Sequence, residues 1–87
     1  MSLTIVKYGR PPGMHRVGVV IGQCTDANLG EMVCVRTPYN VIAGQRFDAV
    51  PADKIEPATI GELRENAKYE IEEAFRRVGT FLYGGGA

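Results

Sequence analysis

The residues of this chain best suited to chemistry are one histidine, two cysteines and a few aspartates. His15 can titrate near neutral pH, but no second histidine, cysteine or partner carboxylate stands near it to complete a metal site or a catalytic pair. Cys24 and Cys34 form neither a CxxC pair nor a metal-ligand cluster. We therefore expect no bound metal and no cofactor.

The two cysteines lie on neighbouring predicted strands, where a disulfide between them is geometrically possible. The first residues of the chain do not combine a basic segment with a long apolar run, so the sequence shows no sign of secretion. Thiols stay reduced in the cytoplasm. We interpret Cys24 and Cys34 as reduced, small, buried hydrophobic residues of a cytoplasmic protein.

Neither the aspartates nor any known catalytic motif indicates an active site. Asp26, Asp48 and Asp53 stand among turn-forming residues, where short carboxylates cap local amides. The sequence contains no Gly-rich phosphate-binding loop, nucleophile elbow or H-E-x-x-H motif. It therefore identifies no catalytic residue, and it favours a protein that is not an enzyme.

Two predicted loops, 10–15 and 37–42, hold the side chains most useful for recognising a ligand. Both are expected at the same end of the folded sheet, and binding residues are concentrated on loops that a rigid scaffold positions. A groove for a protein or small-molecule ligand is therefore expected at this end. The candidate ligand-binding residues are Arg10, Met14, His15, Arg36, Tyr39 and Asn40.

The loops are positioned by short strands, which Gly, Pro and Asn separate along residues 1–57. The expected strands are 3–8, 16–24, 31–36, 45–50 and 55–56, with an irregular connection at 37–44 and a tight 3₁₀ turn at 51–54. If Ile21 pairs with Val35, the hairpin is apolar on both faces. One face then holds Val19, Ile21, Val33 and Val35, and the other holds Val20, Cys24, Met32 and Cys34. The second face is expected to lie beneath the C-terminal helix or another subunit.

This layout resembles an SH3-like small barrel. The resemblance covers about residues 3–57 and rests on five short strands, a long irregular loop after the first, and a Val-Pro-Ala-Asp-Lys-Ile-Glu-Pro segment whose turn joins the last two strands. SH3-like barrels serve as protein-binding modules, enzyme subunits, RNA-binding domains and, in type II dihydrofolate reductase, as a tetrameric enzyme. The aromatic patch of peptide-binding SH3 domains and the Val-Gln-Ile-Tyr run of that reductase do not occur here. The resemblance therefore implies a five-stranded barrel without implying either activity.

Residues 59–78 are predicted to form one amphipathic helix. Thr59 and Glu62 have the spacing of a capping box, which starts a helix, and Gly79 is expected to end it. From Ile60 to Val78, apolar residues recur at intervals of three and four and so share one stripe. At about 28 Å the helix is longer than the barrel is wide, so part of the stripe should overhang. The residues expected to pack on the barrel or on a second subunit are Leu63, Ala67, Ile71, Ala74, Phe75, Val78 and, in the tail 80–87, Phe81.

Length and charge narrow the possible partners. The chain has 87 residues with 10 basic and 10 acidic side chains, so its formal net charge is zero. Such a surface attracts neither nucleic acid nor an anionic membrane over long range, and it favours self-association. No segment approaches the ~20 apolar residues of a membrane span. We expect a homo-oligomer, a dimer or larger, that does not bind nucleic acid or enter a membrane.

The predicted fold is thus mainly β with a C-terminal α-helix: a barrel at 1–57, a helix at 58–79 and a tail. Three functions from different classes are compatible with it. The first is a non-catalytic binding or adaptor module that self-associates through the helix. The second is a small oligomeric enzyme, or a subunit of one, whose active site forms between barrels, and the third is a nucleic-acid-binding module with steep salt dependence. We favour the first.

Overall fold

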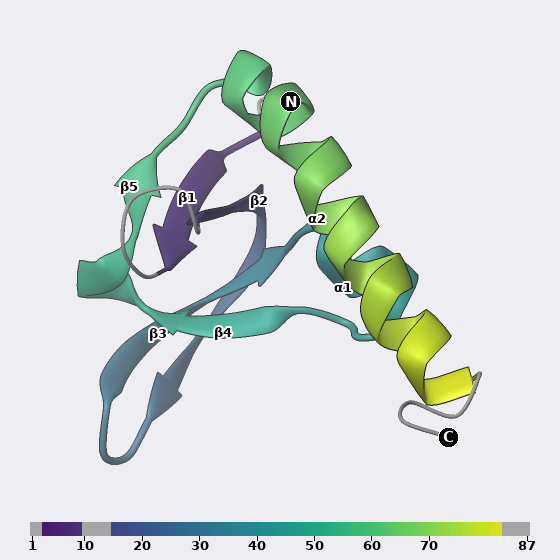
Figure 1. Cartoon of the computed structure of the whole chain (residues 1–87). Coiled ribbons are helices and arrows are strands. Elements are labelled where there is room, and N and C mark those ends of the chain that lie inside the picture. Colours follow the sequence, from purple (N-terminus) through teal and green to yellow (C-terminus); the bar gives the residue numbers. More distant parts are fainter. Residues whose placement is uncertain (1–2, 10–14, 83–87) are drawn as a thin grey trace.

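A five-stranded antiparallel sheet followed by a long C-terminal helix makes up the structure, a computed structural model (Figure 1). It describes residues 3–9 and 15–82, and the side chains of all of these except 80–82. The strands in this part of the chain are β1 (Ile5–Gly9), β2 (His15–Asp26), β3 (Gly30–Arg36), β4 (Asp48–Pro51) and β5 (Glu56–Pro57). The prediction of a mainly β chain with a terminal helix is confirmed.

The strands follow the order β4-β3-β2-β1-β5 across the sheet. A 3₁₀ turn, η1 (Ala52–Lys54), connects the two edge strands β4 and β5, as the sequence predicted. Among the described residues no ladder joins β4 to β5, so the sheet is strongly curved but stays open. The expected closed barrel is therefore present only as a barrel-like sheet.

From Gly22 to the turn the register of the β2–β3 hairpin is the expected one, but a β-bulge shifts it by one residue at Val19 and Val20. Val20 pairs with Val35 and Gly22 pairs with Cys34, so Ile21 is the extra residue and is 52% exposed. A bulge reverses the facing of the residues beyond it. Val20 therefore packs against the core, and the prediction that it shares a face with Cys24 is wrong.

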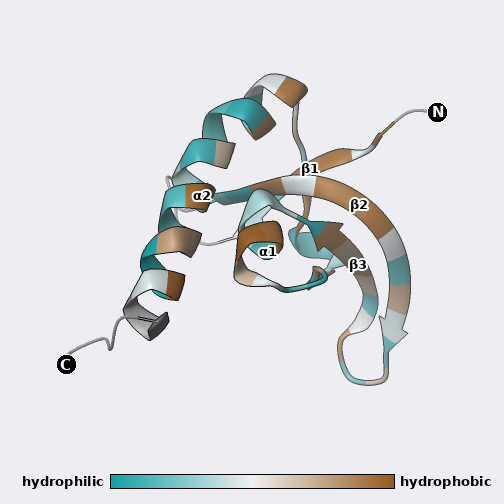
Figure 2. Ribbon diagram, turned by 90° about the vertical axis from the view of Figure 1, so that its right-hand side faces the viewer, coloured by the Kyte–Doolittle hydropathy of each residue, from teal (hydrophilic) through white to brown (hydrophobic). Residues whose placement is uncertain are grey.

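The core lies on the concave face of the sheet. Val6, Val35 and Val50 are its buried residues, and Tyr8, Val20, Val33 and Ile55 pack against them. On the other side of the hairpin Met32 is buried, Cys34 is half-buried and Cys24 is exposed. The interpretation of both cysteines as buried residues is thus wrong for Cys24. It stands near the end of β2, and the β2–β3 hairpin extends away from both helices at that end (Figure 2).

A short helix, α1 (Pro38–Ala43), replaces the irregular connection expected at 37–44. Thr37 caps its N-terminus, Pro38 occupies the first turn, and Asn40 completes a capping box with Thr37. Gly44 ends the helix in the left-handed region with φ 74°, which glycine adopts without steric cost. The cap brings the side chains of Tyr39 and Asn40 into the interior, where both are buried.

The C-terminal helix, α2 (Ile60–Leu82), lies along one side of the sheet and packs against both β2 and α1 (Figure 1). Its start is as predicted, because Thr59 and Glu62 exchange the two hydrogen bonds of a capping box. The prediction that Gly79 ends the helix is wrong, because the helix continues through Gly79 to Leu82. No helix in the described part of the chain has both the length and the apolar character that crossing a bilayer requires.

The apolar stripe of α2 does not coincide with the face that packs on the rest of the protein. Ala74 and Glu70 are buried, with 0% and 2% exposure, whereas Phe75 is 58% and Ile60 54% exposed. The remaining stripe residues in the described part, Leu63, Ala67, Ile71 and Val78, are half-buried. The helix is therefore rotated so that one edge of its stripe covers the protein and the other edge faces outward.

Candidate functional site: a groove between β2 and α2

A groove of about 940 Å³ lies where the start of β2 meets α2. Its lining includes Gly9 at the end of β1, His15 and Arg16 from β2, and a row of polar residues from α2. Three arginines and three glutamates line it, so their charges sum to zero. The α2 residues in this lining are Asn66, Tyr69, Glu70, Glu72, Glu73, Arg76 and Arg77.

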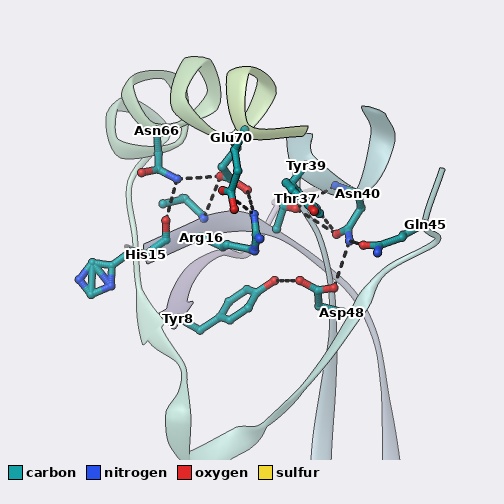
Figure 3. A network of polar contacts seen from close by, with 12 residues as sticks. Tyr8, His15, Arg16, Thr37, Tyr39, Asn40, Gln45, Asp48, Asn66 and Glu70 are labelled. Carbon is teal, nitrogen blue, oxygen red and sulfur yellow. Dashed lines mark hydrogen bonds and ion pairs between the residues drawn. The ribbon is translucent and has the colours of Figure 1, made fainter. Parts of the chain in front are cut away.

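Glu70 is the most deeply buried ionisable residue of the groove, with 2% exposure. Its Oε2 accepts hydrogen bonds from the Val17 backbone amide at 3.2 Å and from Asn66 Nδ2 at 2.7 Å. Asn66 Nδ2 also donates to the His15 carbonyl at 3.0 Å, so α2 is hydrogen-bonded to the first residues of β2 (Figure 3). Glu70 and Asn66 therefore fix the position of β2 relative to α2.

Burial raises the pKa of Glu70, because a carboxylate loses hydration in the interior. Four neighbours lower this pKa without cancelling the effect of burial: Asn66, the Val17 amide, Arg16 and Thr37. The other carboxylate oxygen, Oε1, is out of contact with solvent and has no hydrogen-bond partner among the described residues. The protonated carboxyl is thus favoured here more than in water.

Arg16 and Tyr39 stack below the groove. The Arg16 guanidinium carbon lies 3.8 Å from the centre of the Tyr39 ring, the geometry of a cation–π contact. Arg77 approaches the same tyrosine, with 5.6 Å between its guanidinium carbon and the ring centre, and its Nη1 donates to the Tyr39 hydroxyl at 3.1 Å. The capped helix α1 therefore supports two arginines of the groove with a single aromatic side chain.

Charges of alternating sign form a ladder along the groove: Glu70, Arg16, Glu73 and Arg77. Arg16 Nη1 lies 3.8 Å from Glu70 Oε1 and 3.6 Å from Glu73 Oε2, and Arg77 Nη2 lies 3.2 Å from Glu73 Oε1. The ladder becomes more exposed along its length, from 3% for the Glu70 side chain to 37% for Glu73 and 66% for Arg77. Its outer end is therefore open to a ligand, while its inner end is held within the protein.

A buried hydrogen-bond network holds α1 in place. Asn40 Oδ1 accepts from the Thr37 amide at 2.9 Å and from the Thr37 hydroxyl at 3.0 Å, and Asn40 Nδ2 donates to Gln45 at 3.0 Å and to Asp48 Oδ1 at 3.1 Å (Figure 3). Asp48 also accepts a hydrogen bond from the Tyr8 hydroxyl. Burial, followed by this hydrogen bond, raises the pKa of Tyr8. The network links α1 to β4 and β1 and so keeps Tyr39 under the two arginines.

The structure brings together some of the sequence-predicted ligand residues. His15 lines the groove, Tyr39 supports it, and Asn40 belongs to the network behind it. Arg36 lies elsewhere, where it donates from Nη1 to the Arg46 carbonyl at 3.1 Å. Arg10 and Met14 lie outside the described residues, as does the side chain of Phe81.

Sequence reasoning missed the helix side of the groove. Glu70, Glu73 and Arg77 look like ordinary surface charges in a helix of mixed charge. One signal was available for Glu70: it stands seven residues after Leu63 and four before Ala74, which places it on the packed side of the helix. A carboxylate at such a position requires a buried partner, and this requirement points to β2 or α1.

Comparisons with protein-family models, with curated proteins and with solved structures found no match to this chain. The groove itself is therefore the basis for assigning a function. In residues 3–9 and 15–82 no three His, Cys, Asp or Glu side chains gather in a way that could hold a metal ion.

Proposed function

We propose that the protein is a non-catalytic binding module on an SH3-like small barrel, and that the groove between β2 and α2 receives a segment of a partner protein. The strand order, the strong curvature of the sheet and the 3₁₀ turn between its edge strands support the SH3-like assignment. The charge ladder is the observation that carries the proposed function. Its inner end is rigidly held and its outer end is accessible, which is the arrangement of a preorganised binding site.

The exposed side chains that line the groove include the residue types that dominate protein interfaces. Tyr69 is 65% exposed, and the Arg77 side chain is 66% exposed. Tyrosine and arginine are enriched among the residues that contribute most to binding, because they offer large contact areas together with hydrogen bonds. A groove of about 940 Å³ is also within the usual size range of ligand sites.

The sign of the charges indicates what kind of segment fits. Because arginines and glutamates alternate and sum to zero, a segment with charges of one sign would meet repulsion at every second position. A segment that carries one acidic and one basic side chain can pair with both. We therefore infer that the partner segment has mixed charge.

Titration with three blocked dipeptides tests this inference. Acetyl-Lys-Glu-amide, acetyl-Glu-Glu-amide and acetyl-Lys-Lys-amide are added to the ¹⁵N-labelled protein while amide shifts are recorded by NMR. The mixed dipeptide should shift the Val17 amide and the Asn66 side-chain amide, with an affinity of about 1 mM. At least a fivefold preference over both like-charged dipeptides is expected.

Charge removal within the ladder separates groove binding from general effects. Arg77→Gln should abolish the preference for the mixed dipeptide, because the exposed cation of the ladder is lost. Arg64→Gln, a matched charge removal on the exposed side of α2 outside the groove, should leave it unchanged. Equal shifts with all three dipeptides, or shifts that Arg77→Gln does not alter, would refute the proposed function.

The proposal includes self-association through the outward edge of the α2 stripe, with a second copy of the chain as the partner. Phe75 and Ile60 are large apolar residues that remain more than half exposed there, and a chain with zero net charge has no long-range repulsion between copies. Light scattering after size exclusion should give a mass above that of one chain. Phe75→Glu should reduce it to a monomer, whereas Leu29→Glu, at an equally exposed apolar residue of the β2–β3 turn, should not. A monomeric wild type would remove this part of the proposal.

A further inference from the structure

Cys24 and Cys34 are diagonal neighbours on one face of the β2–β3 hairpin. In the hairpin Gly22 pairs with Cys34 and Cys24 pairs with Met32, so the two cysteines are offset by two positions along the strands. Positions two apart along a strand share a face, and diagonal neighbours in adjacent strands are within reach of each other.

The two cysteines differ in their exposure to solvent. Cys24 is exposed and Cys34 is half-buried. Gly22, which lies opposite Cys34, offers no side chain, and a Cβ added there would meet no atom within 4 Å. A cavity of about 310 Å³, with Cys24 in its lining, opens on the same hairpin. The space beside the pair is therefore free for a change in side-chain position.

The two thiols also influence each other. Burial raises the pKa of the Cys34 thiol, and the neighbouring Cys24 thiol raises it further. Cys24, as the more exposed thiol, is the one that an external disulfide meets first.

We propose that Cys24 and Cys34 form a redox-active dithiol that a low-molecular-weight disulfide, such as oxidised glutathione, converts to an intramolecular disulfide. In the first step the Cys24 thiol loses its proton, and its sulfur attacks one sulfur of oxidised glutathione. The glutathione S–S bond breaks, one glutathione thiolate leaves with the electron pair, and a mixed disulfide forms on Cys24.

In the second step the Cys34 thiol loses its proton and attacks the Cys24 sulfur. The Cys24–Cys34 bond forms, and the second glutathione leaves as a thiolate. The protein gives up two electrons and two protons, and oxidised glutathione becomes two reduced glutathiones. Because the thiolate is the nucleophile and the pKa of Cys34 is raised, ring closure should accelerate as the pH increases.

Ring closure has a structural consequence for the hairpin. Diagonal positions in a regular sheet are about 7–8 Å apart between Cα atoms, whereas a disulfide needs about 4.4–6.8 Å. The two strands must therefore move slightly together, and the bulge next to Gly22 is where they can bend. The disulfide would then tie the projecting end of the hairpin and limit its motion.

The test uses the full chain, first reduced with dithiothreitol and then equilibrated with defined ratios of reduced and oxidised glutathione. After acid quenching, intact mass and alkylation by iodoacetamide are measured. The proposal expects a product lighter than the reduced protein by two hydrogens, with both thiols protected from alkylation. Cys34→Ser should instead accumulate the glutathione adduct on Cys24.

A steric variant tests the geometry while leaving both cysteines in place. Gly22→Val puts a branched side chain opposite Cys34, so ring closure should slow at least tenfold and the mixed disulfide should accumulate. Three results would overturn the proposal: a glutathione adduct as the end product in the wild type, a disulfide-linked dimer as the main oxidised species, or unchanged closure in Gly22→Val.

Discussion

Replacement of Asn40 by aspartate tests the buried network that supports the groove. Asn40 is completely buried, and its Nδ2 donates to Gln45 and to the Asp48 carboxylate. An aspartate has the same shape and keeps the two bonds that Oδ1 accepts from Thr37. It replaces both donated bonds by contacts between oxygen atoms, one of them between two carboxylates. Asn40→Asp therefore removes two interactions without creating a cavity.

The expected loss follows from these two bonds. A neutral hydrogen bond contributes about 0.5–1.5 kcal/mol and one to a charged group about 1.5–3 kcal/mol, so Asn40→Asp should cost about 2–4.5 kcal/mol. A negative charge near the N-terminus of α1 offsets only about 0.3–1 kcal/mol of this. The free energy of unfolding of a domain this size is about 4–13 kcal/mol, so the loss is a large part of it.

Urea unfolding at neutral pH measures this loss, with Asn28→Asp as the control for the same chemical change in an exposed turn. With a urea m-value of about 1 kcal/mol/M, the midpoint of Asn40→Asp should fall by about 2–4 M, or the variant should be unfolded without urea. Burial and the neighbouring Asp48 raise the pKa of the introduced carboxyl, so the loss should shrink as the pH is lowered. A midpoint no lower than that of Asn28→Asp would refute the role of the network.

Three further substitutions test packing and buried charge. Gly18→Ala would put a Cβ 2.5 Å from the Arg36 carbonyl oxygen, so it should cost about 1–3 kcal/mol in urea unfolding, whereas Gly22→Ala, in open space, should change stability by no more than about 0.5 kcal/mol. Equal effects would contradict the close approach at Gly18. Val35→Ala removes two methyl groups from a fully buried site and should cost about 2–3 kcal/mol in the same assay; a loss below about 1 kcal/mol would mean that the core refills the space. Burial raises the folded-state pKa of Glu70 above its unfolded-state value, so the wild type should lose stability as the pH rises between these two values, and Glu70→Gln should not show this loss. Parallel curves of melting temperature against pH would contradict the buried carboxyl.

Sequence patterns were reliable where a structure is specified by neighbours along the chain. The strand segments contain β-branched and aromatic residues between turn formers, and α2 begins at a Thr59–Glu62 capping box. The same kind of signal existed for α1, since Thr37, Pro38, Asn40 and Gly44 are its capping residues. At six residues α1 is too short for a periodic apolar stripe, so its proline and glycine resembled those of a loop.

Features that depend on two distant segments were not readable in this way. The bulge at Ile21 shifted the pairing of Val19 and Val20 by one residue, which placed Val20 against the core. Cys24 has the expected partner, Met32, and its exposure depends on what packs over that end of the hairpin. A helical stripe shows which residues share a face, but it does not show how the helix is rotated against the sheet. The sequence placed Phe75 in the packing stripe, against the sheet or against a second subunit, and the structure shows that it faces away from the sheet.

By itself, the sequence determined that this protein has a curved β-sheet with a 3₁₀ turn between its last strands, followed by one long helix, because these elements follow from local patterns of side chains. Only the tertiary structure decided where the groove lies. Arg16, Tyr39 and Glu70 come from three different elements, and their contacts depend on how α2 and α1 pack against β2. Charges that look like solvated surface residues along the chain become a ladder only when that packing aligns them.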